Sequence, residues 1–168
     1  MSHKVILPEE IDGNVFEMIG SQWALLCAGK ADNFNMMTVS WGQLGVLWNK
    51  PVVTAYVRPQ RHTKRYMDGY DGFTLNFFGT HHREQLKLCG SKSGREIDKM
   101  SVEGLTPVTD KGSVYFEEAE LVLCCKKLYI GELSPDGFEL TELIDKNYPS
   151  KDFHTFSIGE ITRALKKQ

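Results

Sequence analysis

The stretch NMMTVSWGQLGVLWNKPVVTAYVRPQRHT, residues 35–63, decides the fold of this chain. It contains two extended apolar runs that end in a compact basic group. In the first run, residues 37–42, apolar side chains alternate with small polar ones or glycine, which is the period of a half-buried strand. The second run, residues 52–57, is rich in β-branched and aromatic residues and predicts another strand. Pro59 interrupts this second strand just before the basic group.

The basic group that follows the second strand is suited to an anion. Arg58 and Arg61 can each donate a planar pair of N–H groups to phosphate oxygens. Thr63 is predicted to cap a helix over residues 64–70, whose first amides would face the same anion. His62 stands among these groups and is a further candidate. The alternative interpretation is that the two arginines are surface charges paired with acidic residues.

The first strand offers a different surface, in which hydrogen-bonding side chains stand beside flat or polarisable apolar ones. The candidate binding residues on it are Asn35, Met36, Met37, Thr38, Ser40 and Trp41. An apolar, planar, hydrogen-bonding ligand with a phosphate tail would satisfy both the strand and the basic group, and flavin mononucleotide (FMN) is such a ligand. The alternative is an ordinary strand whose alternate positions are packed in a core.

Sequence blocks along nearly the whole chain resemble one known family. The blocks are NMMTVSWG at 35–42, YVRPQRHT at 56–63, FTLNFF at 73–78, GSKSGREIDK at 90–99, FEEAELVLCC at 116–125 and DFHTFSIGEI at 152–161. In this order they resemble the flavin reductase-like, FMN-binding split-barrel family, on its flavoredoxin-like branch. The resemblance implies a split β-barrel, usually a homodimer, with FMN near the subunit interface. It also implies that the strand from Asn35 to Trp41 lines the isoalloxazine ring and the ribityl chain.

The polar loop over residues 90–99 is a second candidate binding segment. Its small residues permit a close approach of backbone to ligand, and the resemblance implies that its hydroxyls and lysine reach the phosphate or the flavin edge. The candidates are Ser91, Ser93, Gly94 and Lys99. The loop lacks the G-x-x-x-x-G-K-[ST] spacing, which excludes a nucleotide P-loop. The alternative is a plain solvated loop.

The cysteines and histidines show no metal-binding pattern. None of the four cysteines forms a C-x-x-C pair, and adjacent Cys124 and Cys125 would point to opposite faces of a strand as buried, inert thiols. The alternative is a redox role for one of these two thiols. The five histidines lack metal-ligand spacing, so we expect no metal site. His154, near Asp152, is either structural or lies at the flavin and biases a proton or hydride step, because an imidazole titrates near neutrality.

The remaining patterns predict a mainly β fold, an antiparallel barrel with two or three short helices. Both faces of residues 23–29 are apolar, which predicts a central strand. Residues 81–90 read as a helix, residues 113–133 as one or two strands, and residues 152–162 as a closing strand. The first dozen residues read as an arm or edge strand, and residues 164–168, ALKKQ, as a solvated tail. We expect one domain over residues 1–168.

Charge and hydropathy narrow the class of protein. A net charge of −2 argues against a nucleic-acid or membrane-surface binder. The longest apolar runs are too short to span a bilayer, and MSHKVILPEE at the start lacks a signal-peptide apolar region. We therefore expect a cytoplasmic protein with neither nucleic-acid nor membrane partners.

These observations favour an FMN-dependent oxidoreductase of the flavin reductase or flavoredoxin type. The electron donor would be NAD(P)H or a ferredoxin-like protein, and the acceptor a flavin, a ferric complex, a quinone or a protein. No G-x-G-x-x-G fingerprint is present, so a nicotinamide would have to stack transiently on the flavin. A second hypothesis is an electron-transfer flavoprotein without general NAD(P)H oxidase activity. A third is a relative that holds another flavin or a haem-like molecule.

Overall fold

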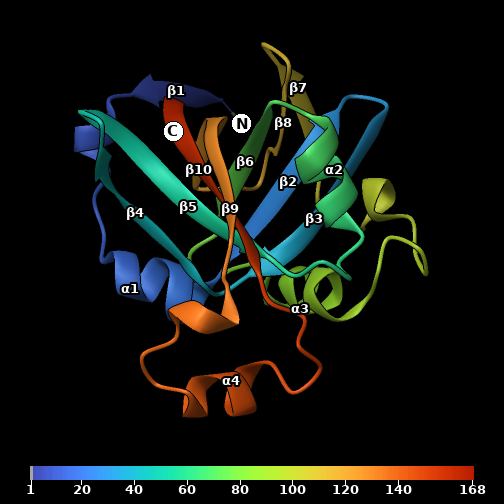
Figure 1. Ribbon diagram of the computed structural model, residues 1–168. Helices are drawn as coiled ribbons and strands as arrows, with labels where there is room; N and C mark the ends of the chain where they lie inside the picture. The colour runs from blue at the N-terminus through green and yellow to red at the C-terminus, as the bar shows by residue number, and fades with distance from the viewer. Residues whose placement is uncertain (1) are drawn as a thin grey trace.

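The fold is built from antiparallel strands that wrap into a barrel (Figure 1). A computed structural model describes residues 2–168. The strands are β1 His3–Ile6, β2 Ala24–Lys30, β3 Asn33–Val39, β4 Gly42–Leu47, β5 Lys50–Val57, β6 Gly72–Phe77, β7 Pro107–Asp110, β8 Ser113–Phe116, β9 Leu121–Glu132 and β10 Thr155–Lys167. The predicted mainly β fold, a barrel with a few short helices, is confirmed.

One eight-stranded sheet forms the barrel wall, in the order β3-β2-β6-β9-β10-β5-β4. The long strand β10 holds the wall together, because β9 pairs with it along most of its length on one side. On its other side the first half of β10 pairs with β5 and the second half pairs with β1. Strands β7 and β8 form a separate hairpin. The sheet path therefore ends at β3 and β4, the two strands that begin the stretch from which the fold was predicted.

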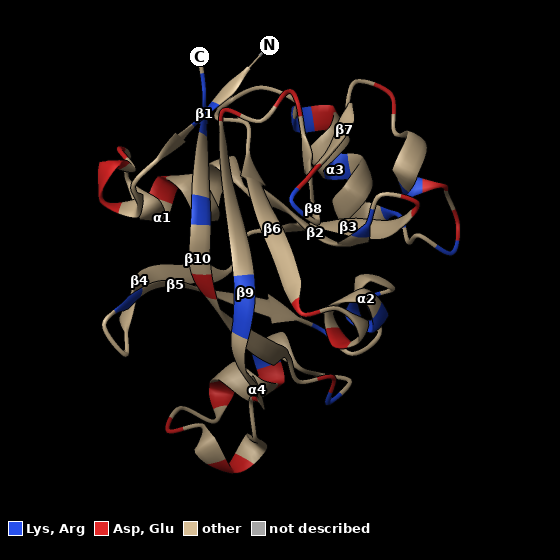
Figure 2. Cartoon of the chain, turned by 90° about the horizontal axis from the view of Figure 1, so that it is seen from above, with Lys and Arg blue, Asp and Glu red and all other residues tan. Residues whose placement is uncertain are grey.

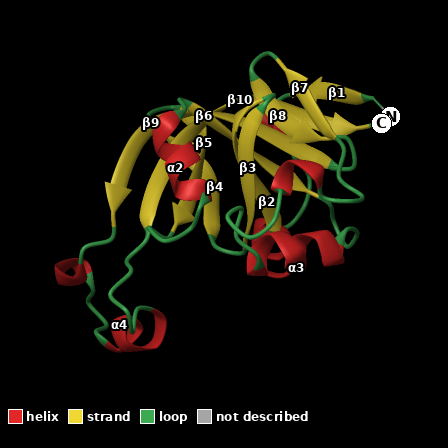
Figure 3. Cartoon of the chain, turned by 90° about the vertical axis from the view of Figure 1, so that its right-hand side faces the viewer, coloured by secondary structure: helices red, strands yellow, loops and turns green. Residues whose placement is uncertain are grey.

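The helices are short and lie outside the barrel (Figure 3). The α-helices are α1 Val15–Glu17, α2 Thr63–Gly69, α3 Arg83–Ser91 and α4 Glu142–Asn147, the 3₁₀ turns are η1 Pro8–Glu10, η3 Lys99–Ser101 and η4 Pro135–Gly137, and η2 Met18–Gln22 is a π-helical turn. The segment that carries α4 projects away from the barrel in both views (Figures 1 and 3). Charged residues gather on loops and helices, whereas most of the strand surface is uncharged (Figure 2).

Two apolar cores lie on the two faces of the sheet. Within β2, Leu26 packs in one core and Leu25 in the other, so both faces of the strand are buried, as predicted for a central strand. The adjacent thiols divide in the same way, with Cys125 in the first core and Cys124 in the second. All four cysteines are buried and free. Burial raises the pKa of the Cys125 thiol, so it stays protonated.

The end of the chain differs from its predicted form. The prediction of a solvated tail over residues 164–168 is wrong, because β10 continues through Lys167. Ala164 and Leu165 are buried, since this part of the strand pairs with β1 on one side and β9 on the other. The predicted edge strand near the start is confirmed as β1, and the Gln168 amide donates to Ser2 O at 3.1 Å. The two termini therefore lie side by side (Figure 1).

Candidate functional site

Three segments far apart in the sequence meet in a pocket of about 190 Å³, here called the basic pocket. They are the start of β3, the turn between β5 and α2, and the loop that follows α3. Most of the predicted site residues line this pocket together: Asn35, Arg61, His62, Thr63, Ser91, Ser93, Gly94 and Lys99. The predicted segments therefore converge, although they are separated by up to 64 positions in the sequence, from residue 35 to residue 99.

Asn35 and Thr63 connect β3 to the start of α2. The Asn35 Nδ2 donates to Thr63 Oγ1 at 2.8 Å, and both side chains are buried. Thr63 is the first residue of α2, and His62 is the N-cap without a side-chain capping bond. The prediction that Thr63 caps this helix is wrong, because its hydroxyl oxygen accepts the bond from Asn35 across the pocket wall.

Lys99 is a buried cation at the base of the basic pocket. Only 4% of the residue is exposed, and its Nζ donates to Met36 O at 2.9 Å and to Cys89 O at 2.8 Å. These bonds tie the loop to β3 and α3. Burial is the main cause that lowers the pKa of Lys99, to about 8, and the nearby Arg61 acts in the same direction.

His62 and Arg61 retain hydrogen-bonding capacity beside this lysine. The Nδ1 of His62 is buried, and no residue among 2–168 offers it a hydrogen-bond partner. Burial lowers the pKa of His62, and the positive charges of Arg95, Arg65 and Lys99 lower it further. Arg61 donates from Nη1 to Gly90 O at 2.9 Å, which holds the guanidinium against the end of α3. An anion placed here would meet concentrated positive charge and an unsatisfied imidazole nitrogen.

Gly94 leaves space in the basic pocket that no other residue type would leave. A Cβ atom at this position would stand 2.4 Å from Asn35 Oδ1 and 2.7 Å from His62 Cδ2. The backbone of the loop therefore approaches the Asn35 and His62 side chains directly. The prediction made from the small residues of this loop, a close approach of its backbone to a ligand, stays a prediction.

A second depression, here called the aromatic groove, begins where β3 ends. It has a volume of about 190 Å³ and is lined by Met37, Thr38, Val39, Ser40, Trp41, Tyr56, Arg58 and His154. Trp41 stands beyond the end of β3 and is 49% exposed, so it does not pack in a core as the alternative interpretation required. Its ring centre lies 5.3 Å from that of His154, and the Tyr56 ring lies 6.2 Å from the same histidine.

Two predicted residues of β3 offer no free group to the two depressions. The Met36 side chain points away from them, and the Thr38 hydroxyl already has a hydrogen-bond partner. Met36 is fully buried in the core beneath α3 and contributes only its carbonyl, which accepts from Lys99. The Thr38 hydroxyl lines the aromatic groove but donates to Leu86 O at 2.5 Å. Met37 packs in the first apolar core and also lines the aromatic groove.

Arg58 does not join Arg61 in the basic pocket. Its Nη1 pairs with Asp152 Oδ2 at 2.6 Å, and its Nη2 donates to Asn147 O at 2.8 Å. The expectation that the two arginines converge on one anion is therefore not met, and Arg58 follows the alternative of an ion pair. The cause is a tight turn, in which the Arg61 amide donates to Arg58 O at 3.1 Å and the chain reverses between the two side chains.

His154 is 7% exposed, and its Nδ1 lies 2.8 Å from the hydroxyl of Tyr148. Burial lowers the pKa of His154 to about 4, and the positive charge of Arg58 adds to the shift while Asp152 opposes it. The imidazole is therefore neutral near pH 7. Tyr56, Tyr148 and Arg95 were not singled out as site residues from the sequence, although Tyr56 and Arg95 stood in segments that had been identified, the second strand and the polar loop.

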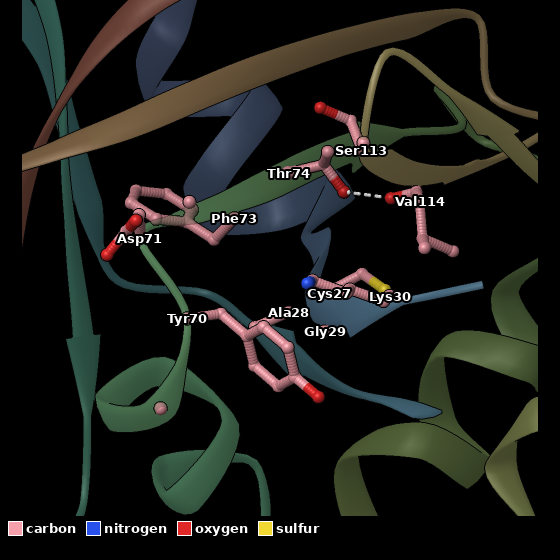
Figure 4. A pocket seen from close by; sticks show the side chains of 13 residues that line it. Cys27, Ala28, Gly29, Lys30, Tyr70, Asp71, Phe73, Thr74, Ser113 and Val114 are labelled. Carbon is pink, nitrogen blue, oxygen red and sulfur yellow. Dashed lines mark hydrogen bonds between the residues drawn. The ribbon is translucent and has the colours of Figure 1, made fainter. Parts of the chain in front are cut away.

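A separate cavity of about 320 Å³ lies between β2, β6 and the β7–β8 hairpin (Figure 4). Its polar groups are largely paired, since the Thr74 hydroxyl donates to Val114 O at 2.7 Å and the Tyr70 hydroxyl accepts from Asn33 at 3.1 Å. None of the predicted site residues lines it. Within residues 2–168 no cluster of histidine, cysteine and carboxylate side chains is arranged to hold a metal ion. No helix in the described part of the chain is long and apolar enough to cross a membrane.

Several solved structures share the fold of this chain. A flavoredoxin from Methanosarcina acetivorans is 22% identical, with a TM-score of 0.66 over 88% of this chain and 69% of its own. An FMN-binding protein from Thermus thermophilus is 16% identical, with a TM-score of 0.69 over 98% of this chain and 82% of its own. An NADH:FAD oxidoreductase from Streptomyces globisporus is 15% identical, with a TM-score of 0.65 over 87% of this chain and 74% of its own.

Comparison with protein families gives a match over most of the chain. No protein with a curated description matches. The family model described as "Flavin reductase like domain" matches residues 16–166, which include both the basic pocket and the aromatic groove. The chain therefore belongs to the flavin reductase-like family.

Proposed function

We propose that this protein is an FMN-binding oxidoreductase in which one flavin spans the basic pocket and the aromatic groove. The observation that carries the proposal is that strand β3 and the residue that follows it serve both, with Asn35 in the pocket and Ser40 in the groove. Five residues of extended chain cover roughly 17 Å. A ligand with a planar ring at one end and a phosphate at the other therefore lies along this strand.

The basic pocket has the donor set that a phosphate requires. Arg61 and Lys99 supply positive charge, and the buried Nδ1 of His62 gains a partner if it carries a proton that a phosphate oxygen accepts. The loop backbone around Gly94 closes over the anion without a side chain in between. We assign one phosphate group to this pocket of about 190 Å³, and FMN is the flavin that carries a single phosphate.

The aromatic groove has the surface that a flavin ring requires. Trp41 and Tyr56 provide flat apolar contacts, and His154 provides a polar edge. When bound, the flavin supplies the hydride and electron transfer. The residues of the chain hold the phosphate, orient the ring and exclude water from its buried face.

The electron donor is proposed to be NAD(P)H or a ferredoxin-like protein, and the acceptor a flavin, a ferric complex, a quinone or another protein. Support comes from the family and from an NADH:FAD oxidoreductase among the proteins of the same fold. The second candidate function is an electron-transfer flavoprotein, favoured by the flavoredoxin of the same fold. Anaerobic stopped-flow mixing with NADH and NADPH separates the two. Bleaching of the flavin absorbance on the timescale of turnover supports the reductase, whereas reduction only by a ferredoxin supports the carrier.

A homodimer in the cytoplasm is proposed as the working form. A hollow of about 730 Å³ adjoins the aromatic groove, shares Trp41 and Tyr56 with it, and is also lined by Phe16, which is 89% exposed. The hairpin between β4 and β5 adds Trp48, which is 58% exposed. A second subunit that covers these apolar side chains would also close the groove. The molar mass in solution, measured by light scattering, tests whether the protein is a dimer.

FMN affinity should fall as pH rises above about 8. The pKa of Lys99 in the free protein is about 8, so the ammonium that attracts the phosphate is progressively lost above that pH. Binding must then take up one proton, and the dissociation constant rises toward a limit of about tenfold per pH unit. Fluorescence titrations between pH 7.5 and 9.5 measure this slope, and a Lys99→Met variant should show a flat profile. A flat profile in the unaltered protein would remove Lys99 from the phosphate site.

The substitution Gly94→Ala should weaken FMN binding while leaving the barrel folded. The new methyl group would stand 2.4 Å from Asn35 Oδ1, so the loop or the Asn35 side chain must move. We expect a loss of roughly tenfold in affinity, because displacement of the pocket wall disturbs at least one hydrogen bond to a charged group. The matched control is Gly137→Ala in the η4 turn, where an added Cβ atom would meet no atom within 4 Å and which lies outside both depressions. Unchanged affinity in Gly94→Ala would show that the loop does not close over the phosphate.

A further inference from the structure

Tyr148 and His154 form a shielded hydrogen-bonded pair at the edge of the aromatic groove. The Tyr148 hydroxyl lies 2.8 Å from His154 Nδ1. Tyr148 is 5% exposed and His154 is 7% exposed, so water competes little for this bond. Tyr148 follows α4 on the projecting segment between β9 and β10, whereas His154 immediately precedes β10. The pair therefore links the projecting segment to the groove.

The direction of this hydrogen bond follows from the proton that the phenol carries. No other group in residues 2–168 forms a hydrogen bond with the Tyr148 hydroxyl. Burial raises the pKa of Tyr148, so its hydroxyl keeps its proton near neutral pH. If Nδ1 donated instead, the phenolic proton would be left without an acceptor in a buried position. The hydroxyl therefore donates to Nδ1, and the remaining proton of the neutral ring sits on Nε2.

The Nε2 of His154 opens onto the aromatic groove. This nitrogen has no hydrogen-bond partner within the described chain, and it is not fully buried. His154 is itself one of the residues that line the groove. A proton on Nε2 is therefore available to an acceptor atom of whatever occupies the groove.

The projecting segment is anchored so that the Tyr148 hydroxyl keeps its place. Arg58 holds both sides of the tyrosine, through its bond to Asn147 O and its ion pair with Asp152. Its guanidinium also lies 5.0 Å from the centre of the Tyr148 ring. The ring also stacks on Phe153, with centres 4.8 Å apart. This anchoring is a role for Arg58 that differs from the phosphate contact expected from the sequence.

We propose that Tyr148 is a positioning residue that fixes His154 in the Nε2–H form, so that a neutral N–H donor faces an oxygen or nitrogen at the edge of the flavin ring. This inference rests on the proposed flavin function for the identity of the acceptor, but the Tyr148–His154 pair itself does not. A neutral donor stabilises negative charge that develops on the ring without delivering a free proton to it. The titratable or charged groups around the imidazole are Arg58, Asp152, Tyr56 and Tyr148.

The experiment is nitrogen NMR of histidine in the full-length protein prepared without flavin. With ¹⁵N-labelled histidine, couplings from the ring carbon-bound protons report which nitrogen of His154 carries the proton, and His154→Gln identifies its signals. We expect the Nε2–H form in the unaltered protein. In Tyr148→Phe the two nitrogen signals should move toward each other as both forms become populated. Tyr129→Phe is the matched control, because Tyr129 is exposed and its hydroxyl makes no hydrogen bond within the described chain.

The outcomes separate this proposal from the proposed function. An Nδ1–H form in the unaltered protein, or unchanged His154 signals in Tyr148→Phe, overturns the positioning role. Addition of FMN should then shift the Nε2 signal of the unaltered protein. FMN that binds without shifting Nε2 overturns the donor role of His154. A failure of FMN to bind overturns the proposed function and the flavin acceptor, while the form of His154 in the flavin-free protein still decides the role of Tyr148.

Discussion

Arg61→Ala should weaken FMN binding by roughly 10- to 100-fold. Arg61 lines the basic pocket, where its guanidinium is held against Gly90 O and faces the space that we assign to the phosphate. A hydrogen bond to a charged group contributes about 1.5–3 kcal/mol, and each 1.4 kcal/mol corresponds to a factor of ten in the dissociation constant. The quenching of FMN fluorescence on titration with flavin-free protein measures the change.

Arg65→Ala provides the control for this prediction. Arg65 carries the same charge four positions away, but it is exposed on α2, with its guanidinium over the Tyr66 ring, and it does not line the pocket. We expect its loss to change the FMN affinity less than threefold, which is the scale of a screened surface charge. Equal losses in the two variants would mean that only the net charge of the region matters. Unchanged affinity in Arg61→Ala would mean that the phosphate binds elsewhere.

Lys99→Ala should both abolish tight FMN binding and destabilise the protein by about 2–4 kcal/mol. The ammonium of Lys99 donates to Met36 O and Cys89 O, and its removal leaves two buried carbonyl groups without that partner. Each unsatisfied buried group costs about 1–3 kcal/mol, and part of that cost is recovered because the desolvated cation is also removed. For a chain of this size, the midpoint of thermal unfolding should fall by about 5–15 °C.

Lys87→Ala is the matched control for the thermal measurement. Lys87 lies on the exposed side of α3 and its side chain makes no hydrogen bond within residues 2–168. Its replacement should shift the midpoint by no more than about 2 °C. If Lys99→Ala unfolds at the temperature of the unaltered protein, the ammonium does not tie the loop to β3 and α3. Lys99 then does not form the floor of the basic pocket.

Residues whose neighbours in the sequence determine their environment were predicted well. The alternation in residues 37–42 and the apolar run at 52–57 led to β3 and β5, and the apolar faces of residues 23–29 led to an interior strand. The small residues around Gly94 predicted a close approach of the loop backbone to a ligand, and that stays a prediction, although a Cβ atom at Gly94 would stand only 2.4 Å from Asn35 Oδ1. In each case local steric and hydrophobic preferences agree with the final fold.

Features that depend on contacts distant in sequence were not predicted. The solvated tail at residues 164–168 is instead the end of β10, because β1 and β9 supply partners from both sides. Arg58 and Arg61 look equivalent in the sequence, but a turn separates them and Asp152, 94 positions away, takes the first. Nothing in the local sequence around Tyr148 marks it as the partner of His154. Their pairing depends on how the projecting segment folds back on the barrel.

The most direct test of the central claim is a parallel titration of the flavin-free protein with FMN and with riboflavin. The two ligands share the ring and the ribityl chain, but only FMN carries the phosphate that we place beside Arg61, His62 and Lys99. We predict micromolar or tighter binding of FMN and binding of riboflavin that is weaker by about 100-fold or more, since several charged hydrogen bonds are lost. Equal affinity for both ligands, or no uptake of FMN, would contradict a flavin held jointly by the aromatic groove and the basic pocket.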